Sequence, residues 1–266
     1  MAHAMTHHPS ECLAERSASI EIGRALFRSP ALLGGPAARA GLSCNACHSN
    51  GGMNTSFLLP ELTDRAGHAD VTSEWASRTL GDGVSNPIAI PDLVGASGKS
   101  AFGTREVPTL AEFTRNVIEQ EFQGERPPTQ AFEGVLAYMR ALRLRACPAE
   151  HLSAVSLATA ADDVRRTLAA TREADAPTRS LLLLAAQDAV GRVVERLPAR
   201  HFRRDRRRLE ALSRDLGAAR NASDPLAVLE ATAWSTRFDA AIARIGPREQ
   251  RTYFNEATLA AALGQP

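Results

Sequence analysis

"GLSCNACHSNGG", residues 41–52, is the stretch that decides the fold expected of this chain. Cys44 and Cys47 stand three positions apart, and His48 follows the second cysteine directly. Each thiol can add to one vinyl group of a haem, and two intervening residues let both sulfurs reach the same porphyrin edge. The next residue then lies under the iron. The spacing therefore predicts one covalently bound haem c on Cys44 and Cys47, with His48 as the proximal iron ligand.

Two other kinds of site use cysteines at this spacing. A zinc site needs a second pair of ligands, such as another C-x-x-C or an H-x-H, and the sequence supplies none. A redox dithiol of the thioredoxin type needs a strand before the motif and a helix after it. The preceding residues, "LLGGPAARAG", are not typical of a strand. Haem attachment is therefore the interpretation that the motif favours over zinc binding and dithiol chemistry.

The chain changes character near "RACPAEH", residues 145–151. Before this point, glycine- and proline-rich segments separate three helical patterns, at residues 17–29, 108–122 and 129–144. Residues 50–108 show little regular pattern. A loop this long needs a surface to pack on, which a buried cofactor would supply. We therefore predict an all-α protein whose residues 15–147 form a cytochrome c-like haem domain with long loops.

The remainder, residues 151–266, predicts a second, helical domain whose role the sequence does not indicate. Amphipathic helices are expected near residues 152–173, 178–196, 199–219, 224–244 and 247–263, with prolines at or near the joints. Short joints favour antiparallel neighbours and hence a helical bundle. The densest charge run, "RHFRRDRRRLEAL" at residues 200–212, continues a helical stripe and predicts a solvated helix face.

Two cysteines lie outside the motif. Cys12 precedes the first expected helix, and Cys147 follows the last helix of the haem domain. A disulfide between them would tie both ends of that domain and would fit an oxidising compartment. Two unrelated thiols are the alternative.

The sequence around the motif resembles a known family. Ile22, Gly23, Leu26 and Phe27 in "IEIGRALFRSPALLG", followed by "GLSCNACH", look like the start of the bacterial dihaem cytochrome c peroxidase family, which includes the methylamine-utilisation dihaem enzymes. "NPIAIPDL", "FGTREVPTLAEFTRNVIEQEF" and "VLAYMRAL" resemble later segments of the same family. The resemblance covers residues 17–145, the peroxidatic first domain. The family's second C-x-x-C-H domain has no counterpart in this sequence, where a helical region stands instead.

The resemblance also implies further site residues. Glu121 matches the family's acid–base glutamate, and Arg105, in the "FGTR" segment, would stabilise an oxyanion or pair with a haem propionate. His68 is the nearest equivalent of the family's distal loop histidine. Met53, Met139 and a water-ligated or open iron are the alternatives for the distal position. Solvent-exposed side chains are the alternatives for Glu121 and Arg105.

Two functions follow from these expectations. The first is a monohaem c-type cytochrome that transfers one electron to or from a redox partner protein or electron carrier. The second is a peroxidase-like haem enzyme that reduces hydrogen peroxide or oxidises a partner at an open iron site. A haem-based sensor with the helical half as its output is a third reading, without a motif of its own.

The composition and the first residues of the chain give expectations about binding partners and about the cellular compartment. The formal net charge of +1 gives no general reason to expect nucleic acid or an anionic membrane. No apolar run reaches the roughly 20 residues that span a bilayer. Covalent haem attachment takes place outside the bacterial inner membrane, yet residues 1–16 lack the apolar core of a signal peptide. We expect a periplasmic protein whose signal is missing from this sequence.

Overall fold

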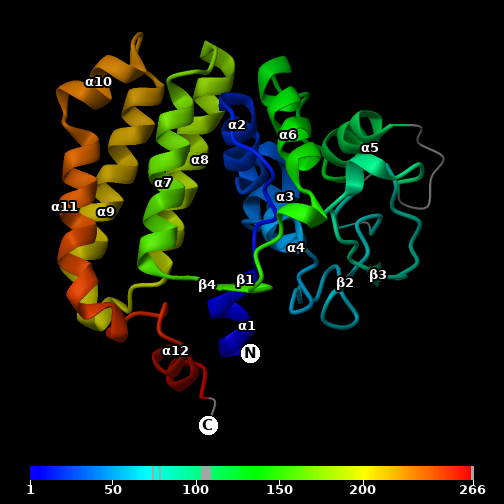
Figure 1. Ribbon diagram of the computed structural model, residues 1–266, viewed down its shortest axis with the longest axis horizontal. Helices are drawn as coiled ribbons and strands as arrows, with labels where there is room; N and C mark the ends of the chain where they lie inside the picture. Colours follow the sequence, from blue (N-terminus) through cyan, green and yellow to red (C-terminus); the bar gives the residue numbers. More distant parts are fainter. Residues whose placement is uncertain (74, 78, 103–108, 265–266) are drawn as a thin grey trace. The chain divides into compact units, whose positions relative to one another are not determined.

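The computed structural model describes residues 1–73, 75–77, 79–102 and 109–264. The protein is mostly helical and divides into two compact units (Figure 1). The motif unit comprises Pro9–Ser153 and carries the C-x-x-C-H sequence. The helical unit comprises Met1–His8 together with Ala154–Pro266. The chain passes between them within strands β1 (His7–Pro9) and β4 (Leu152–Ala154), which pair as a two-stranded sheet.

The motif unit contains short helices separated by long irregular segments. Its α-helices are α2 (Ala18–Phe27), α3 (Gly35–Arg39), α4 (Cys44–Cys47), α5 (Leu110–Asn116) and α6 (Thr129–Ala141). Tighter turns lie at η1 (Pro30–Leu32), η2 (Ser49–Gly51), η3 (Ala96–Gly98) and η5 (Leu144–Ala146), and η4 (Val117–Glu121) is a π-helical turn. The helix expected over residues 108–122 is therefore an α-helix that widens into a π turn in its second half.

Helices α2 and α6 form the centre of the motif unit, and they approach each other at two glycines. The Ser17 side chain caps the start of α2 by accepting a hydrogen bond from the Ile20 N–H. A Cβ added to Gly23 would overlap the Gly134 carbonyl oxygen. The two backbones therefore approach more closely than any side chain would allow. Close packing continues at the Phe27 and Tyr138 rings, whose centroids are 5.2 Å apart.

This crossing predicts the effect of adding one methyl group. We expect Gly23→Ala to lower the free energy of unfolding by about 1–3 kcal/mol, because the two helix backbones must separate. The loss should occur even though alanine favours helix over glycine by about 1 kcal/mol. Gly191→Ala is the matched control, since a Cβ there meets nothing within 4 Å. Urea denaturation followed by circular dichroism should show the control unchanged or stabilised. Equal or greater stability of Gly23→Ala would refute the close crossing.

The long loop between the motif and α5 has supports of its own. Strands β2 (His68–Ala69) and β3 (Ile88–Ala89) pair antiparallel. Backbone hydrogen bonds join the Gly67 N–H to the Phe57 carbonyl, at 2.9 Å, and the Ile90 N–H to the Gly67 carbonyl, at 3.0 Å. The loop also buries apolar side chains, namely Phe57, Leu62, Ala69 and Ile90. A cofactor is therefore not the only surface that this loop packs on, contrary to the expectation from its length alone.

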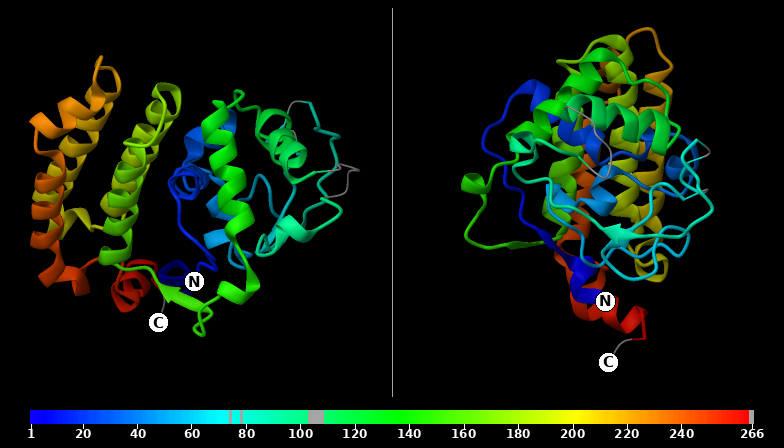
Figure 2. Two further views of the ribbon diagram at one scale, coloured as in Figure 1. Left: turned by 45° about the horizontal axis from the view of Figure 1, so that its top comes forward. Right: turned by 90° about the vertical axis from the view of Figure 1, so that its right-hand side faces the viewer.

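The helical unit is a bundle around one apolar core. Its long helices are α7 (Leu157–Thr171), α8 (Ala176–Glu195), α9 (Ala199–Arg220) and α11 (Trp234–Ile245), which run alongside one another in both views of Figure 2. The shorter elements are α1 (Ala2–Thr6), α10 (Pro225–Ala231), η6 (Gly246–Arg251) and α12 (Glu256–Ala262). Trp234 is fully buried in the core, and its indole N–H donates to the Leu212 carbonyl at 2.9 Å.

Two of the helices expected in this unit are each divided. The pattern over residues 224–244 forms α10 and α11, which are separated at Ala233, where φ is +46°. The pattern over residues 247–263 forms η6 and then α12, whose start is capped by the Asn255 side chain. Among the described residues, no helix has the length and apolarity that crossing a membrane requires.

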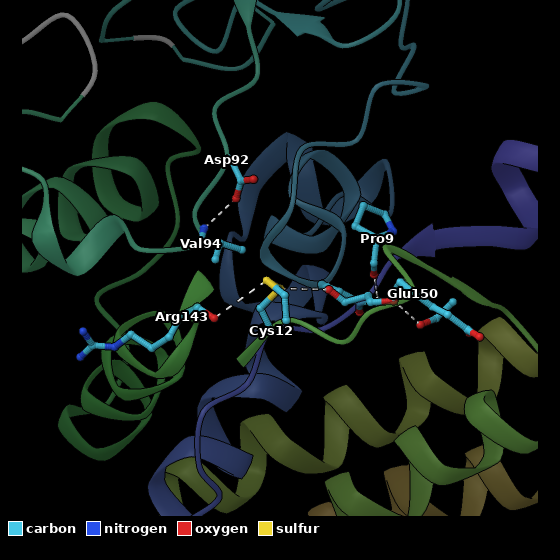
Figure 3. Close-up of a disulfide and its surroundings, with 10 residues drawn as sticks. Pro9, Cys12, Asp92, Val94, Arg143 and Glu150 are labelled. Carbon is cyan, nitrogen blue, oxygen red and sulfur yellow. Dashed lines mark hydrogen bonds between the residues drawn. A yellow bond between two sulfur atoms is a disulfide. The ribbon is translucent and has the colours of Figure 1, made fainter. Parts of the chain in front are cut away.

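A disulfide closes the motif unit near both of its ends. Cys12 and Cys147 are bonded to each other across a sequence separation of 135 residues (Figure 3). The segments beside them pair as well, since Leu13 forms an antiparallel bridge with Leu142. The Arg143 N–H donates to the Cys12 carbonyl at 2.9 Å. The disulfide therefore joins two segments that are also hydrogen-bonded to each other.

Candidate functional site

The two motif cysteines occupy the first and last positions of the single turn α4. Both are free thiols, in contrast to Cys12 and Cys147, and both are half-buried. Burial raises the pKa of the Cys44 thiol to about 12, and burial together with the neighbouring Cys44 raises that of Cys47 to about 12. A redox dithiol needs a thiolate near neutral pH. These pKa values therefore disfavour dithiol chemistry at the motif.

His48 follows α4 with its ring fixed by a single acceptor. Its backbone N–H donates to the Cys44 carbonyl at 2.8 Å. The ring Nδ1 lies 2.9 Å from the Pro91 carbonyl oxygen. A carbonyl can only accept, so this contact requires the proton on Nδ1 and leaves the lone pair on Nε2. Metal-bound histidines are held in the same way by a partner on the second ring nitrogen.

The surroundings also keep this imidazole neutral. Desolvation lowers the pKa of His48 to about 4, outweighing the opposite effects of the Pro91 carbonyl and of Asp92. A neutral imidazole with a defined tautomer is the form that binds a metal ion. The site thus contains a neutral imidazole whose Nε2 can bind a metal ion, and two free thiols precede it in the chain.

Pro91 is held in place by its neighbours. The Leu93 N–H donates to the Gly51 carbonyl at 2.9 Å, which joins the loop to the end of the motif. The Asp92 side chain accepts from the Val94 N–H at 2.7 Å (Figure 3), and Lys99 Nζ donates to the Asp92 carbonyl at 3.0 Å. The role of Pro91 was not predicted from the sequence. Pro91 lies in "NPIAIPDL", a segment that was noted only for its resemblance to the family.

Asn50 turns the chain away from the motif. Its φ of +54° is left-handed, a conformation that asparagine tolerates better than most residues. Its backbone N–H donates to the Asn45 side chain at 2.9 Å, and its own amide donates to the Pro9 carbonyl at 2.8 Å. Its side-chain oxygen accepts from Arg28 at 2.6 Å. The turn after His48 is therefore anchored to α2 and to the start of the unit.

A buried ionic network lies behind this turn. Glu11 accepts from Arg24 Nε at 2.9 and 3.0 Å, from Arg28 at 2.9 Å and from the Tyr138 hydroxyl at 2.8 Å. Burial raises the pKa of Glu11, but the charges of Arg28 and Arg24 and the Tyr138 hydrogen bond outweigh it and bring the pKa down to about 2. The network joins residues that lie far apart in the chain, so no local pattern in the sequence predicted it.

The structure places the three candidates for the distal iron ligand in different settings. His68 lies half-buried in β2, opposite Ala89, two residues before Pro91. Ala89 belongs to the segment that leads to Pro91, whose carbonyl contacts the Nδ1 edge of His48. The Met53 side chain is largely exposed, and Met139 is buried within α6 among core residues. Among the described residues, no hydrogen bond joins any of the three to His48, whose ring contacts Pro91 instead, so the distal ligand stays a prediction.

Glu121 is buried rather than solvated. The exposed fraction of the residue is 7%, and it ends the π turn η4. This burial overturns the alternative of a solvent-exposed helix-end carboxylate at Glu121. The preceding residue, Gln120, is held by its carbonyl, which accepts from the Ser77 hydroxyl at 2.8 Å. Arg105 lies outside the described residues.

A separate group of metal-ligand side chains lies in the helical unit. His3, His7 and Glu256 place their ligand atoms within 4.8 Å of one another, and His3 Nδ1 is 3.1 Å from a Glu256 oxygen. This contact joins α1 to α12. Among the described residues it is the single group of three or more such side chains, and it excludes the motif cysteines. A zinc site with a complete ligand set at Cys44 and Cys47 is thus not formed by the described residues.

Comparison with protein-family models, with curated proteins and with solved structures found no match to this chain. The functional assignment therefore rests on the residues and geometry of the motif unit.

Proposed function

We propose that the motif unit binds one haem covalently through Cys44 and Cys47, with His48 as the proximal iron ligand, and that the protein is a monohaem c-type cytochrome. The observation that carries the proposal is the 2.9 Å contact between His48 Nδ1 and the Pro91 carbonyl. It directs the lone pair of the imidazole to Nε2, beside two thiols that are free and reduced. When bound, the haem supplies a one-electron iron couple.

The chain's own residues have distinct tasks in this function. Cys44 and Cys47 fix the porphyrin edge, and His48 provides the ligand nitrogen. Pro91 holds the ring in place and increases the basicity of Nε2 by accepting from Nδ1–H. The Arg28–Asn50 contact keeps the turn after His48 closed. A redox partner protein or electron carrier would complete the reaction by exchanging one electron.

Attachment gives the direct test of this proposal. We expect protein made together with c-type maturation proteins to retain its haem in acidic butanone. Cys44→Ala/Cys47→Ala should lose covalent haem, whereas Cys12→Ser/Cys147→Ser should keep it. Intact mass and pyridine haemochrome spectra measure both. Haem that extracts freely from the native sequence, or a purified protein with zinc in its place, would contradict the assignment.

Peroxide reduction is the second candidate function, and the burial of Glu121 favours it. A buried carboxylate can give and take a proton at a peroxide oxygen. The reaction converts one hydrogen peroxide to two waters and takes two electrons from a reduced partner and two protons. The ferric spectrum separates the two candidates. A six-coordinate low-spin spectrum supports the carrier. A high-spin spectrum that shifts with cyanide, and peroxide turnover lost in Glu121→Gln, support the enzyme.

We further propose that the mature protein works in the periplasm. The Cys12–Cys147 disulfide supports this location, because disulfides persist in oxidising compartments. Fractionation of cells that express the natural gene tests it. Haem-free protein recovered from the cytoplasm would contradict both the location and the cytochrome assignment.

A further inference from the structure

The helical unit contains an arginine-lined cavity that the proposed function does not use. It has a volume of about 550 Å³, within the usual range of small-molecule sites. Its walls come from the first turns of α9 and from the end of α11 with η6. Six arginines line it, namely Arg200, Arg203, Arg204, Arg208, Arg244 and Arg248. The run "RHFRRDRRRLEAL" was expected to be a solvated helix face, and its arginines at 200, 203, 204 and 208 are exposed as expected. Arg244 and Arg248 line the other side of the same open pocket.

Two of these arginines are held in fixed positions. Asp205 is buried, and its two carboxylate oxygens accept from Arg208 at 3.1 Å and from Arg248 at 2.8 Å. The Arg248 guanidinium also lies over the Phe202 ring, 4.7 Å from its centroid. The conformational freedom of these two side chains is therefore already reduced before any ligand arrives, which favours binding.

The other arginines in the cavity carry uncompensated charge. Within the part of the chain that the structure describes, no acidic partner is seen for Arg200, Arg203, Arg204 or Arg244. Six arginines against one aspartate leave an excess of five positive charges in one cavity. Three of them lie in the first two turns of α9, where the helix dipole disfavours cations. An anion in the cavity would relieve both the mutual repulsion and the unfavourable dipole.

We propose that this cavity binds a small polyanion bearing phosphate groups. Guanidinium groups pair with phosphate oxygens through two parallel hydrogen bonds, and several arginines can share one oligophosphate. A second cavity of about 250 Å³ shares Arg208 and Arg244 and is otherwise lined by Ala211, Leu212, Arg237, Ala240 and Ala241. An apolar group joined to the phosphate would fit there. Two kinds of ligand carry such phosphate groups, namely a free oligophosphate and a phospholipid headgroup.

Calorimetry with inorganic tripolyphosphate, and flotation with vesicles containing phosphatidic acid, distinguish these two sources. Arg204→Gln/Arg244→Gln removes two charges from the cavity. Arg207→Gln/Arg214→Gln removes two exposed charges from α9 outside the cavity, and is the matched control. We expect the cavity variant to bind the preferred probe at least tenfold more weakly and the control to change less than twofold. Circular dichroism should show both variants folded.

Three outcomes would overturn the proposal. Equal weakening by the cavity and control variants would mean that only net charge matters. Failure of both probes to bind at moderate salt would mean that the cavity has no phosphate ligand. Tighter binding of duplex DNA than of either probe, with the same loss in both variants, would indicate a non-specific nucleic-acid surface.

Discussion

Replacing Cys12 and Cys147 together by serine should lower the free energy of unfolding of the motif unit by about 5 kcal/mol. The disulfide closes a loop of 135 residues, which contains almost the whole unit. In the chain-entropy description, a cross-link over so many residues lowers the conformational entropy of the unfolded chain. This destabilises the unfolded state by about 5 kcal/mol. The folded unit should keep its haem motif, because neither cysteine takes part in it.

Hydrogen exchange measured by mass spectrometry on the full chain is the suitable readout for this change. Peptides from α2 and α6 should exchange much faster in the double variant, while peptides from α8 should not change. Wild-type protein treated with reductant should match the variant and serves as the control for the serine side chains. A change below about 1 kcal/mol would show that the Leu13–Leu142 bridge and the Arg143–Cys12 hydrogen bond already fix the ends.

The long helices could be predicted from the sequence because their signals are local. Helical periodicity, prolines near the joints and capping side chains lie within the segments that they organise. The ends of α8 and α9 accordingly fall within two residues of the expected ones. The division at Ala233 was missed, because a left-handed alanine has no signature in composition and depends on how α10 and α11 pack.

The candidate site was predictable only in its contiguous part. Cys44, Cys47 and His48 occur together in the chain, so their spacing alone indicates the chemistry. Pro91 acts on His48 from 43 residues away, and only the fold brings the two together. The same holds for Glu11, whose partners lie in α2 and α6. Glu121 is buried at the end of a π turn, and an ordinary helical pattern indicates neither the turn nor the burial.

The second large effect concerns the buried carboxylate of Glu11. We expect Glu11→Gln to lower the free energy of unfolding by about 3–5 kcal/mol, because it removes the carboxylate charge that faces two buried guanidinium groups. Only 9% of the Arg24 side chain and 5% of the Arg28 side chain are exposed. The turn at Asn50 should loosen as well, since Arg28 donates to both Glu11 and Asn50.

The effect of this variant should depend on pH in a defined direction. The pKa of Glu11 in the folded protein is about 2, below its ordinary value of 4.5. The carboxylate therefore stabilises the fold fully above pH 4.5, and this contribution is lost as the pH falls toward 2. The lowered pKa corresponds to about 3 kcal/mol. The difference in stability between wild type and Glu11→Gln should thus be constant from pH 6 to 8 and should shrink below about pH 4.5.

Glu15→Gln is the matched control, because Glu15 lies four residues further along in an exposed position. Urea denaturation at several pH values, followed by circular dichroism, compares the three proteins, and hydrogen exchange locates the change. Peptides covering residues 45–52 should lose protection in Glu11→Gln and keep it in Glu15→Gln. A stability difference between wild type and Glu11→Gln that persists unchanged at pH 2.5 would contradict the ionic origin. The loss would then come from altered packing around Tyr138, whose hydroxyl donates to Glu11 at 2.8 Å.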